Sequence, residues 1–338
     1  MQDDLPIPVP NNQLPGVPLE NGLAFDPPTP AARPEPKVRV VLLVQILLFV
    51  LLLLLGWLLF QLISSLGGWD NSRILLGQLA ADAPPSERWQ MRLFIALSSP
   101  LPFVVSGFAT AWIFYRRLSP GFPGWREYLG ARQWPSLRRV GQACLLLLVA
   151  MPLVLFLLMV SKSLPMPEVL RNIEVSTDEM LKGLLQMDNL WELLANLLLI
   201  ALLPALGEEV VFRGVLQQQL MRRIANPWVA IVVTATIFSA IHGQFDGFLS
   251  RLLLGFLLGW LYWQTQSLWV PVAAHFFNNG LQVVGQYLFH SQISTVDLEK
   301  DVEVPWLAAA MSLVLIIGIM RWIDRDAVSS ENKEKTMN

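Results

Sequence analysis

Charged residues are scarce in this chain of 338 residues. They make up 15% of the sequence, whereas an average soluble domain has about 25%. The formal net charge is only −2, so no strong field attracts a polyanion and binding to nucleic acid is not expected. A single cysteine, Cys144, excludes an intramolecular disulfide. The sequence also lacks tandem repeats, a glycine-rich phosphate loop and paired CxxC motifs.

Hydrophobic residues, by contrast, make up 54% of the chain. A helix needs about 20 predominantly apolar residues to cross a bilayer, and eight runs approach this length. They lie at 40–63, 93–115, 140–160, 190–206, 227–241, 249–263, 268–289 and 304–322. We expect the fourth run to continue as one long helix beyond its apolar part. The predicted fold is all-α, a polytopic transmembrane helical bundle with about eight membrane spans.

Composition divides the chain into three parts. Residues 1–37 are rich in proline and poor in large apolar residues, which predicts a disordered N-terminal tail. Residues 38–323 form the predicted transmembrane domain, and residues 324–338 form a polar C-terminal tail. Within the membrane domain, residues 190–290 hold most of the polar side chains that interrupt apolar runs.

Arginine placement predicts the orientation. Six arginines crowd the connection after the second run: Arg116, Arg117, Arg126, Arg132, Arg138 and Arg139. Because cytoplasmic loops carry an excess of Lys and Arg, this connection should be cytoplasmic. Alternation of the spans then places both termini on the cytoplasmic side.

The stretch GEEVVFRG, residues 207–214, brings three charges into an apolar context. Glu209 and Arg213 are one helical turn apart, so their side chains can pair. Glu208 points about 100° away around the helix and has no local partner. A charge at the centre of a bilayer costs roughly 2.5–3.5 kcal/mol on insertion scales, which makes an unpaired carboxylate there a candidate functional group.

Two further polar clusters follow in FSAIH, which ends at His242, and in HFFNN, which holds His275 and Asn279. In an antiparallel hairpin centred near Ala225, Glu208 and His242 reach the same level. His275 and Asn279 share one helical face. Polar side chains in membrane helices also hold helices together without any chemical role, and for any one cluster alone that interpretation is at least as good.

The ordered set EExxxR, FxxxH and HxxxN on successive helices resembles the CPBP intramembrane proteases. This family is also called Abi or CAAX protease 2, and it includes the Rce1-type prenyl-protein endopeptidases. The resemblance covers roughly residues 190–290. Each motif is weak alone, whereas the ordered set inside membrane helices is specific.

The resemblance implies a role for each residue of the motifs. Glu208 would act as the base that activates a water, and His242 would help to hold that water. His275 and Asn279 would stabilise the oxyanion, while Glu209 and Arg213 would orient the others. The family is described both as metalloproteases and as metal-free glutamate proteases. If a zinc ion takes part, its ligands would be Glu208, His242 and His275, although the HExxH signature is missing.

The leading hypothesis is therefore an integral membrane endopeptidase that cleaves a membrane-associated peptide near the cytoplasmic side of the bilayer. A prenylated CaaX tail is one specialised substrate of the family. The alternatives are a non-catalytic immunity or scaffold protein with the same fold, and a proton-coupled transporter. The expected partners are membrane lipid and a peptide or protein substrate, and the expected location is a prokaryotic plasma membrane. The sequence does not determine the oligomeric state.

Overall fold

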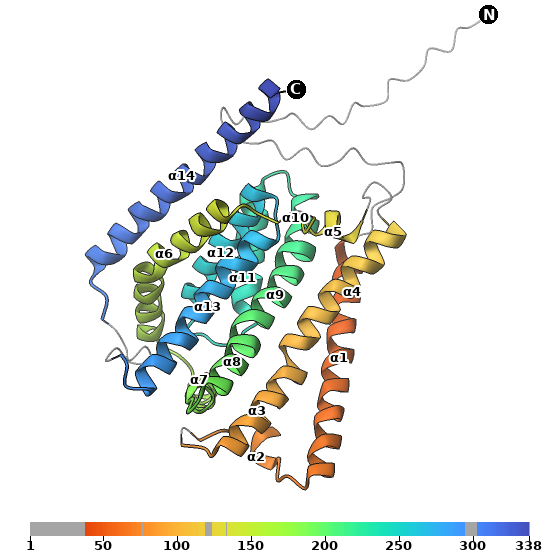
Figure 1. Cartoon of the computed structure of the whole chain (residues 1–338), viewed down its shortest axis with the longest axis vertical. Helices are drawn as coiled ribbons and strands as arrows, with labels where there is room; N and C mark the ends of the chain where they lie inside the picture. Colours follow the sequence, from red (N-terminus) through yellow and green to blue (C-terminus); the bar gives the residue numbers. More distant parts are fainter. Residues whose placement is uncertain are drawn as a thin grey trace, which may run out of the picture.

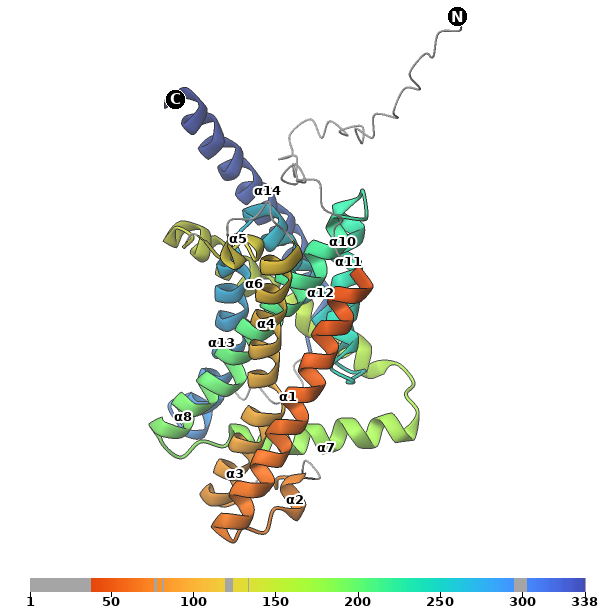
Figure 2. The same cartoon turned by 90° about the vertical axis from the view of Figure 1, so that its right-hand side faces the viewer.

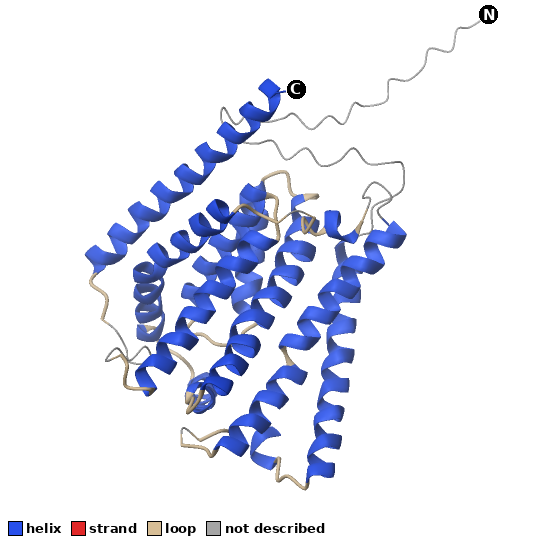
Figure 3. Cartoon of the chain, viewed as in Figure 1, coloured by secondary structure: helices blue, strands red, loops and turns tan. Residues whose placement is uncertain are grey.

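The computed structural model describes residues 38–75, 78–80, 82–118, 124–132, 134–294 and 303–337. Among these residues every regular element is a helix (Figure 3). The predicted all-α fold is thus confirmed. The proline-rich tail predicted for residues 1–37 lies outside the described residues.

The N-terminal part forms one side of the bundle, as Figure 1 shows. Helix α1 (Val38–Gly67) is followed by the short α2 (Ser72–Leu75) and by the consecutive helices α3 (Pro85–Ser98) and α4 (Pro100–Leu118). Helices α3 and α4 are separated only at Ser99, because Pro100 begins a new helix. Val41 of α1, Phe114 of α4 and Val215 of the fourth span form a small buried cluster between them. The short α5 (Trp125–Tyr128) and the third span, α6 (Leu137–Ser163), come next along the chain.

Helix α7 (Glu168–Leu185) lies across the bundle, in the lower part of the view of Figure 2. Its exposed apolar residues include Val169, Val175 and Leu181. A helix with both charged and exposed apolar residues is suited to a membrane interface.

The fourth span is one continuous helical path from Leu190 to Met221, as predicted, and includes two π-helical segments. Its parts are α8 (Leu190–Asn196), the π-helical η1 (Leu197–Leu202), α9 (Leu203–Glu209), the π-helical η2 (Val210–Gln217) and α10 (Gln218–Met221). A buried ion pair fixes its beginning to α3: Arg88 Nη2 lies 3.0 Å from Glu192 Oε2.

Four helices complete the bundle: α11 (Pro227–Ala240), α12 (Phe248–Thr265), α13 (Trp269–His290) and α14 (Trp306–Met337). Asn226 caps α11 by accepting from the backbone N–H of Trp228, and Pro227 takes the first helical position. The main core cluster joins α12 and α13 to α6 and α14, and includes Leu146, Leu257, Trp260 and Ile316. Helix α14 continues through the polar C-terminal segment to Met337.

Each of the eight predicted runs lies largely within one helix or within consecutive helical segments. Among the described residues, five helical segments are long and apolar enough to cross a membrane: Val40–Gly67, Pro85–Phe114, Leu137–Ser163, Leu190–Met221 and Trp306–Asp326. Helix α11 is apolar but has only 14 residues, and α12 and α13 carry several polar side chains. The number of helical segments that meet this measure is therefore lower than the predicted eight spans, because α11 is too short and polar side chains lower the hydropathy of α12 and α13.

Candidate active site

Close packing of small residues fixes the position of Glu208 and Glu209 in the bundle. A Cβ atom on Gly207 would lie 2.9 Å from the backbone nitrogen of Val104, and one on Gly107 would lie 2.7 Å from a methyl carbon of Val210. Helices α4 and α9 therefore approach more closely than larger residues would allow. The π-helical segment η2 begins directly after Glu209, and π-helical turns are frequent at functional sites.

Glu209 and Arg213 form an ion pair, as the spacing predicts. Arg213 Nη1 lies 3.0 Å from Glu209 Oε1, and neither side chain is exposed. The guanidinium also donates through Nη2 to the carbonyl oxygen of Gly255, 3.1 Å away, and lies over the Phe238 ring at 4.8 Å. A buried charge needs such partners, since breaking a buried pair is strongly destabilising.

His275 lies between the two glutamates. Its Nδ1 atom is 2.8 Å from Glu209 Oε1, and its Nε2 atom is 3.9 Å from Glu208 Oε2. The carboxylate of Glu209 is paired with Arg213 and can only accept, so Nδ1 of His275 carries the hydrogen. The second ring nitrogen, Nε2, is then left to face Glu208.

His242 follows the end of α11, two residues after Ala240, and is exposed. Its Nδ1 atom lies 2.8 Å from the carbonyl oxygen of Phe238, four residues earlier. A carbonyl oxygen only accepts hydrogen bonds, so Nδ1 of this ring also carries the hydrogen. In the neutral ring, Nε2 therefore has a free lone pair that can accept a hydrogen bond from water.

A cavity of about 320 Å³ brings the predicted residues together. Glu208, His242, His275 and Asn279 all line it, whereas Glu209 and Arg213 are not part of the lining. Glu208 is partly exposed, its side chain being 18% accessible. The full lining consists of Leu147, Ile200, Pro204, Glu208, Phe238, His242, Arg251, Leu254, Leu258, His275, Asn278, Asn279 and Gln282.

The amide of Asn279 has a defined orientation in this lining. Its Oδ1 atom accepts a hydrogen bond of 3.2 Å from Nδ2 of Asn278. Its Nδ2 atom has a long contact of 3.5 Å with the carbonyl oxygen of Ile200. The amide nitrogen is thus the donor that remains available to a ligand, because a 3.5 Å contact is weak.

The structure also brings in residues that the sequence motifs miss. Arg251 of α12 lines the cavity and donates through Nη1 to Oε1 of Gln244, 3.1 Å away, and through Nη2 to the backbone oxygen of the same residue. The sequence does carry a sign of Arg251, because it is the one charged residue in the apolar stretch FLSRLLLGF. A charged residue in an apolar run of a membrane helix indicates a functional site, as it does for Glu208 and Glu209. Asn278 and Gln282 are further polar residues of the lining.

The side chains in this arrangement do not fit the zinc site considered for Glu208, His242 and His275. Across the described part of the chain, no three His, Cys, Asp or Glu residues lie close enough together to hold a metal ion. A catalytic zinc requires three such ligands at about 2.0–2.2 Å.

A larger cavity of about 680 Å³ lies elsewhere, and its lining includes none of the predicted catalytic residues. It is formed around Arg132, Trp134, Arg138 and Gln266. We place the candidate site in the smaller cavity because that cavity combines a carboxylate, two imidazoles and a guanidinium.

Comparisons with known proteins agree with this location. Residues 190–281 match the family model described as type II CAAX prenyl endopeptidase Rce1-like. The "Putative membrane peptidase YdiL" of Bacillus subtilis (strain 168) is 30% identical over 79 residues, which cover 23% of this chain and 32% of that protein. The "Uncharacterized protein YpbD" of the same organism is 35% identical over 85 residues, 24% of this chain and 40% of that protein.

Each of these matches spans less than half of the relative's own length. No solved structure matches the chain. The range matched by the family model, residues 190–281, includes all six predicted site residues: Glu208, Glu209, Arg213, His242, His275 and Asn279. Residues 190–281 of this chain are therefore similar to the Rce1-like family of CAAX prenyl endopeptidases.

Proposed function

We propose that this protein is an integral membrane endopeptidase that hydrolyses a peptide bond in a membrane-associated substrate. The observation that carries the proposal is the convergence of Glu208, His242, His275 and Asn279, from three separate parts of the chain, on one cavity. The family match over the same region supports it. A prenylated CaaX tail is one candidate substrate, and a prokaryotic plasma membrane with both termini cytoplasmic is the proposed setting.

In the proposed mechanism Glu208 is the general base. Its carboxylate removes a proton from a water molecule held by Nε2 of His242, and the oxygen of this water attacks the scissile carbonyl carbon. Glu208 then passes the proton to the leaving amine as the carbon–nitrogen bond breaks. Proton transfer by a positioned side chain contributes about 10²–10⁴-fold to a rate.

The tetrahedral intermediate carries an oxyanion, which Asn279 Nδ2 stabilises by donating a hydrogen bond. His275 can donate from Nε2 only as an imidazolium, because Nδ1 already carries the hydrogen that Glu209 accepts. Loss of one oxyanion donor costs about 2.7–4 kcal/mol in a well-studied hydrolase.

The test compares purified wild-type protein with the variants Glu208→Gln and His242→Ala in cleavage of a library of membrane-tethered peptides. We expect Glu208→Gln to lower the rate by about 10²–10⁴-fold, and His242→Ala to lower it as well. The matched controls are Glu179→Gln on α7 and His290→Ala at the end of α13, since both residues are exposed and neither lines the cavity.

Circular dichroism and thermal unfolding establish that the variants fold. Unchanged cleavage by Glu208→Gln would remove this residue from the mechanism. Cleavage that is absent even in the wild type would favour the non-catalytic scaffold. Proton-coupled solute uptake that is lost in Glu208→Gln would favour the transporter.

A further inference from the structure

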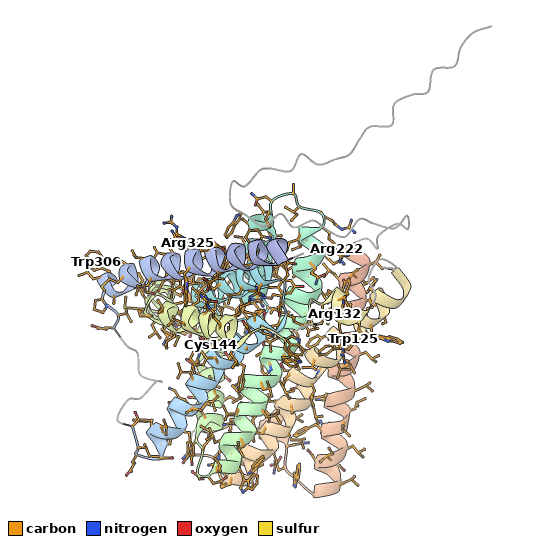
Figure 4. The ribbon with its side chains drawn as sticks, turned by 45° about the horizontal axis from the view of Figure 1, so that its top comes forward. Trp125, Arg132, Cys144, Arg222, Trp306 and Arg325 are labelled. Carbon is orange, nitrogen blue, oxygen red and sulfur yellow. The ribbon has the colours of Figure 1, made fainter. Side chains whose placement is uncertain are left out.

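The two ends of the bundle differ in charge. The end at the top of Figure 1 holds α5, α10 and the C-terminal part of α14. Several arginines lie in or next to these elements. Figure 4 labels three residues of this end, Arg132, Arg222 and Arg325. With Arg126, Arg138, Arg139, Arg223 and Arg321 they form a broad cationic rim, in which Arg138 also pairs with Asp326 at 2.6 Å. We call this end the arginine-rich end.

The opposite end carries α2 and α7, together with the beginning of α8 (Figures 1 and 2). Two of its arginines, Arg88 and Arg92, are buried and paired with Glu192. Its other cations are Arg73, Lys162, Arg171 and Lys182, and they are fewer than its carboxylates. Its carboxylates include Asp70, Asp82, Glu87, Glu168, Glu174, Asp178, Glu179, Asp188 and Asp246. Because positively charged connections remain in the cytoplasm, the arginine-rich end is the cytoplasmic end and the α7 end is the extracytoplasmic end.

The direction of α11 places His242 far from the arginine-rich end. The helix begins at Pro227, shortly after Arg223, and ends at Ala240. Its 14 residues span about 21 Å at 1.5 Å per residue, which is about two thirds of a hydrocarbon layer of roughly 30 Å. His242 therefore lies in the extracytoplasmic half of the bilayer.

Burial along the cavity lining shows which end is open. His275, near the beginning of α13, is only 7% exposed. His242 and Gln282, which lie further toward the α7 end, are exposed. The catalytic carboxylate of Glu208, 18% exposed, has an intermediate accessibility. The cavity thus opens near His242 and Gln282 and closes toward the arginine-rich end.

The loop beside this opening is fixed to α7. Glu174 of α7 is 6% exposed and accepts from the backbone nitrogen of Asp246 at 3.2 Å and from that of Phe245. On the other side of the loop, the Arg251 guanidinium holds Gln244. The interfacial helix α7 and the cavity opening therefore belong to the same end of the molecule.

We propose that substrates enter this cavity from the extracytoplasmic side of the membrane. The substrate class is then a membrane-tethered peptide whose scissile bond lies in the outer half of the bilayer or just outside it. The substrate part of this inference rests on the proposed peptidase activity. It replaces the expectation of cleavage near the cytoplasmic side, and it disfavours a prenylated cytoplasmic tail as the substrate.

Cysteine accessibility tests the orientation without any need for activity. In a Cys144→Ser background, Phe245→Cys reports on the cavity opening and Trp134→Cys on the arginine-rich end; the two side chains are 39% and 76% exposed. A membrane-impermeant maleimide should label Phe245→Cys in intact spheroplasts as strongly as in permeabilised ones. Trp134→Cys should react only after permeabilisation. Val169→Cys on α7 serves as a second reporter should Phe245→Cys fail to fold.

As a control, both cysteine variants must react with the maleimide in detergent, which shows that each introduced thiol can be labelled. In intact spheroplasts, the proposal requires that Phe245→Cys (or Val169→Cys) is labelled and that Trp134→Cys is not. Any other labelling result overturns the proposal. A second arm presents the same cleavable segment on a single-span reporter, either outside or inside the cytoplasmic membrane. Cleavage of the outside reporter alone supports the proposal, and cleavage of the inside reporter overturns it. If neither reporter is cleaved while the labelling is as expected, the peptidase assignment fails and the orientation stands.

Discussion

The Nδ1 atom of His275 lies 2.8 Å from Oε1 of Glu209, and the same oxygen lies 3.0 Å from Nη1 of Arg213. One buried carboxylate thus connects a guanidinium on its own helix with an imidazole on α13. This contact determines which nitrogen of His275 faces the cavity. It also explains why two adjacent glutamates are present: one orients the histidine and the other lines the cavity.

Glu209→Gln should destabilise the fold as well as lower activity. The substitution leaves the fully buried Arg213 without a counter-charge, and breaking a buried pair in this way costs about 3–5 kcal/mol. Thermal unfolding in detergent measures the effect. The control is Glu127→Gln, which removes a partly exposed pair with Arg132 at 3.5 Å and should cost about 0–1 kcal/mol. Equal melting temperatures of the two variants would contradict the structural role of Glu209.

Asn279→Ala should lower kcat by about 10²–10³-fold with little change in KM, because an oxyanion donor acts mainly in the transition state. Asn278→Ala should have a smaller effect, since Asn278 lines the cavity but uses its amide nitrogen to donate to Oδ1 of Asn279. Steady-state kinetics on one cleaved peptide separates the two constants. A rise in KM alone for Asn279→Ala would instead indicate ground-state binding of the substrate.

Gly247→Ala should reduce cleavage while leaving the melting temperature nearly unchanged. The added Cβ would lie 2.2 Å from Nη1 of Arg251 and 2.6 Å from its Cζ, so the guanidinium must leave its position beside Gln244. The cost to the fold is small because the colliding group is the end of a flexible side chain. Gly318→Ala, where no atom lies within 4 Å, is the matched control. Wild-type rates for Gly247→Ala would show that the Arg251–Gln244 contact is dispensable.

Gly56→Ala should lower the melting temperature clearly. A Cβ at this position would lie 2.0 Å from the backbone oxygen of Leu97, so α1 would have to move away from α3. Overpacking of this kind costs typically about 1–3 kcal/mol. The control is Gly141→Ala on α6, where the added Cβ would meet no atom within 4 Å. This substitution should not lower the melting temperature. A loss of stability shared by both variants would point to a general effect of substitution in apolar helices.

The mechanism assigns proton transfer to Glu208, so it predicts that activity survives dialysis against a chelator. The measurement is the cleavage rate before and after EDTA treatment, with and without added zinc. Activity that disappears with the chelator and returns with zinc would overturn the metal-independent form of the mechanism. It would then require a rearrangement of Glu208, His242 and His275 into a ligand set.

The helices themselves follow from the sequence, because apolar runs near the length of a bilayer have few alternatives to a helix. The runs at 40–63 and 140–160 lie within α1 and α6, and the fourth run continues past Glu208 to Met221. Helical periodicity was sufficient to pair Glu209 with Arg213, since both residues belong to one helix. The antiparallel hairpin geometry likewise anticipated that Glu208 and His242 would lie near the same cavity.

The sequence alone determined which segments are helical, which polar residues interrupt them, and which charges pair within a single turn. Only the tertiary structure decided that His275 contacts Glu209, 66 residues away, that Arg251 joins the lining, and that the opening lies toward α7. Those features depend on how each helix is rotated and shifted against its neighbours. Packing sets that arrangement through close approaches such as Gly107 against Val210, and no local pattern along the chain encodes such contacts.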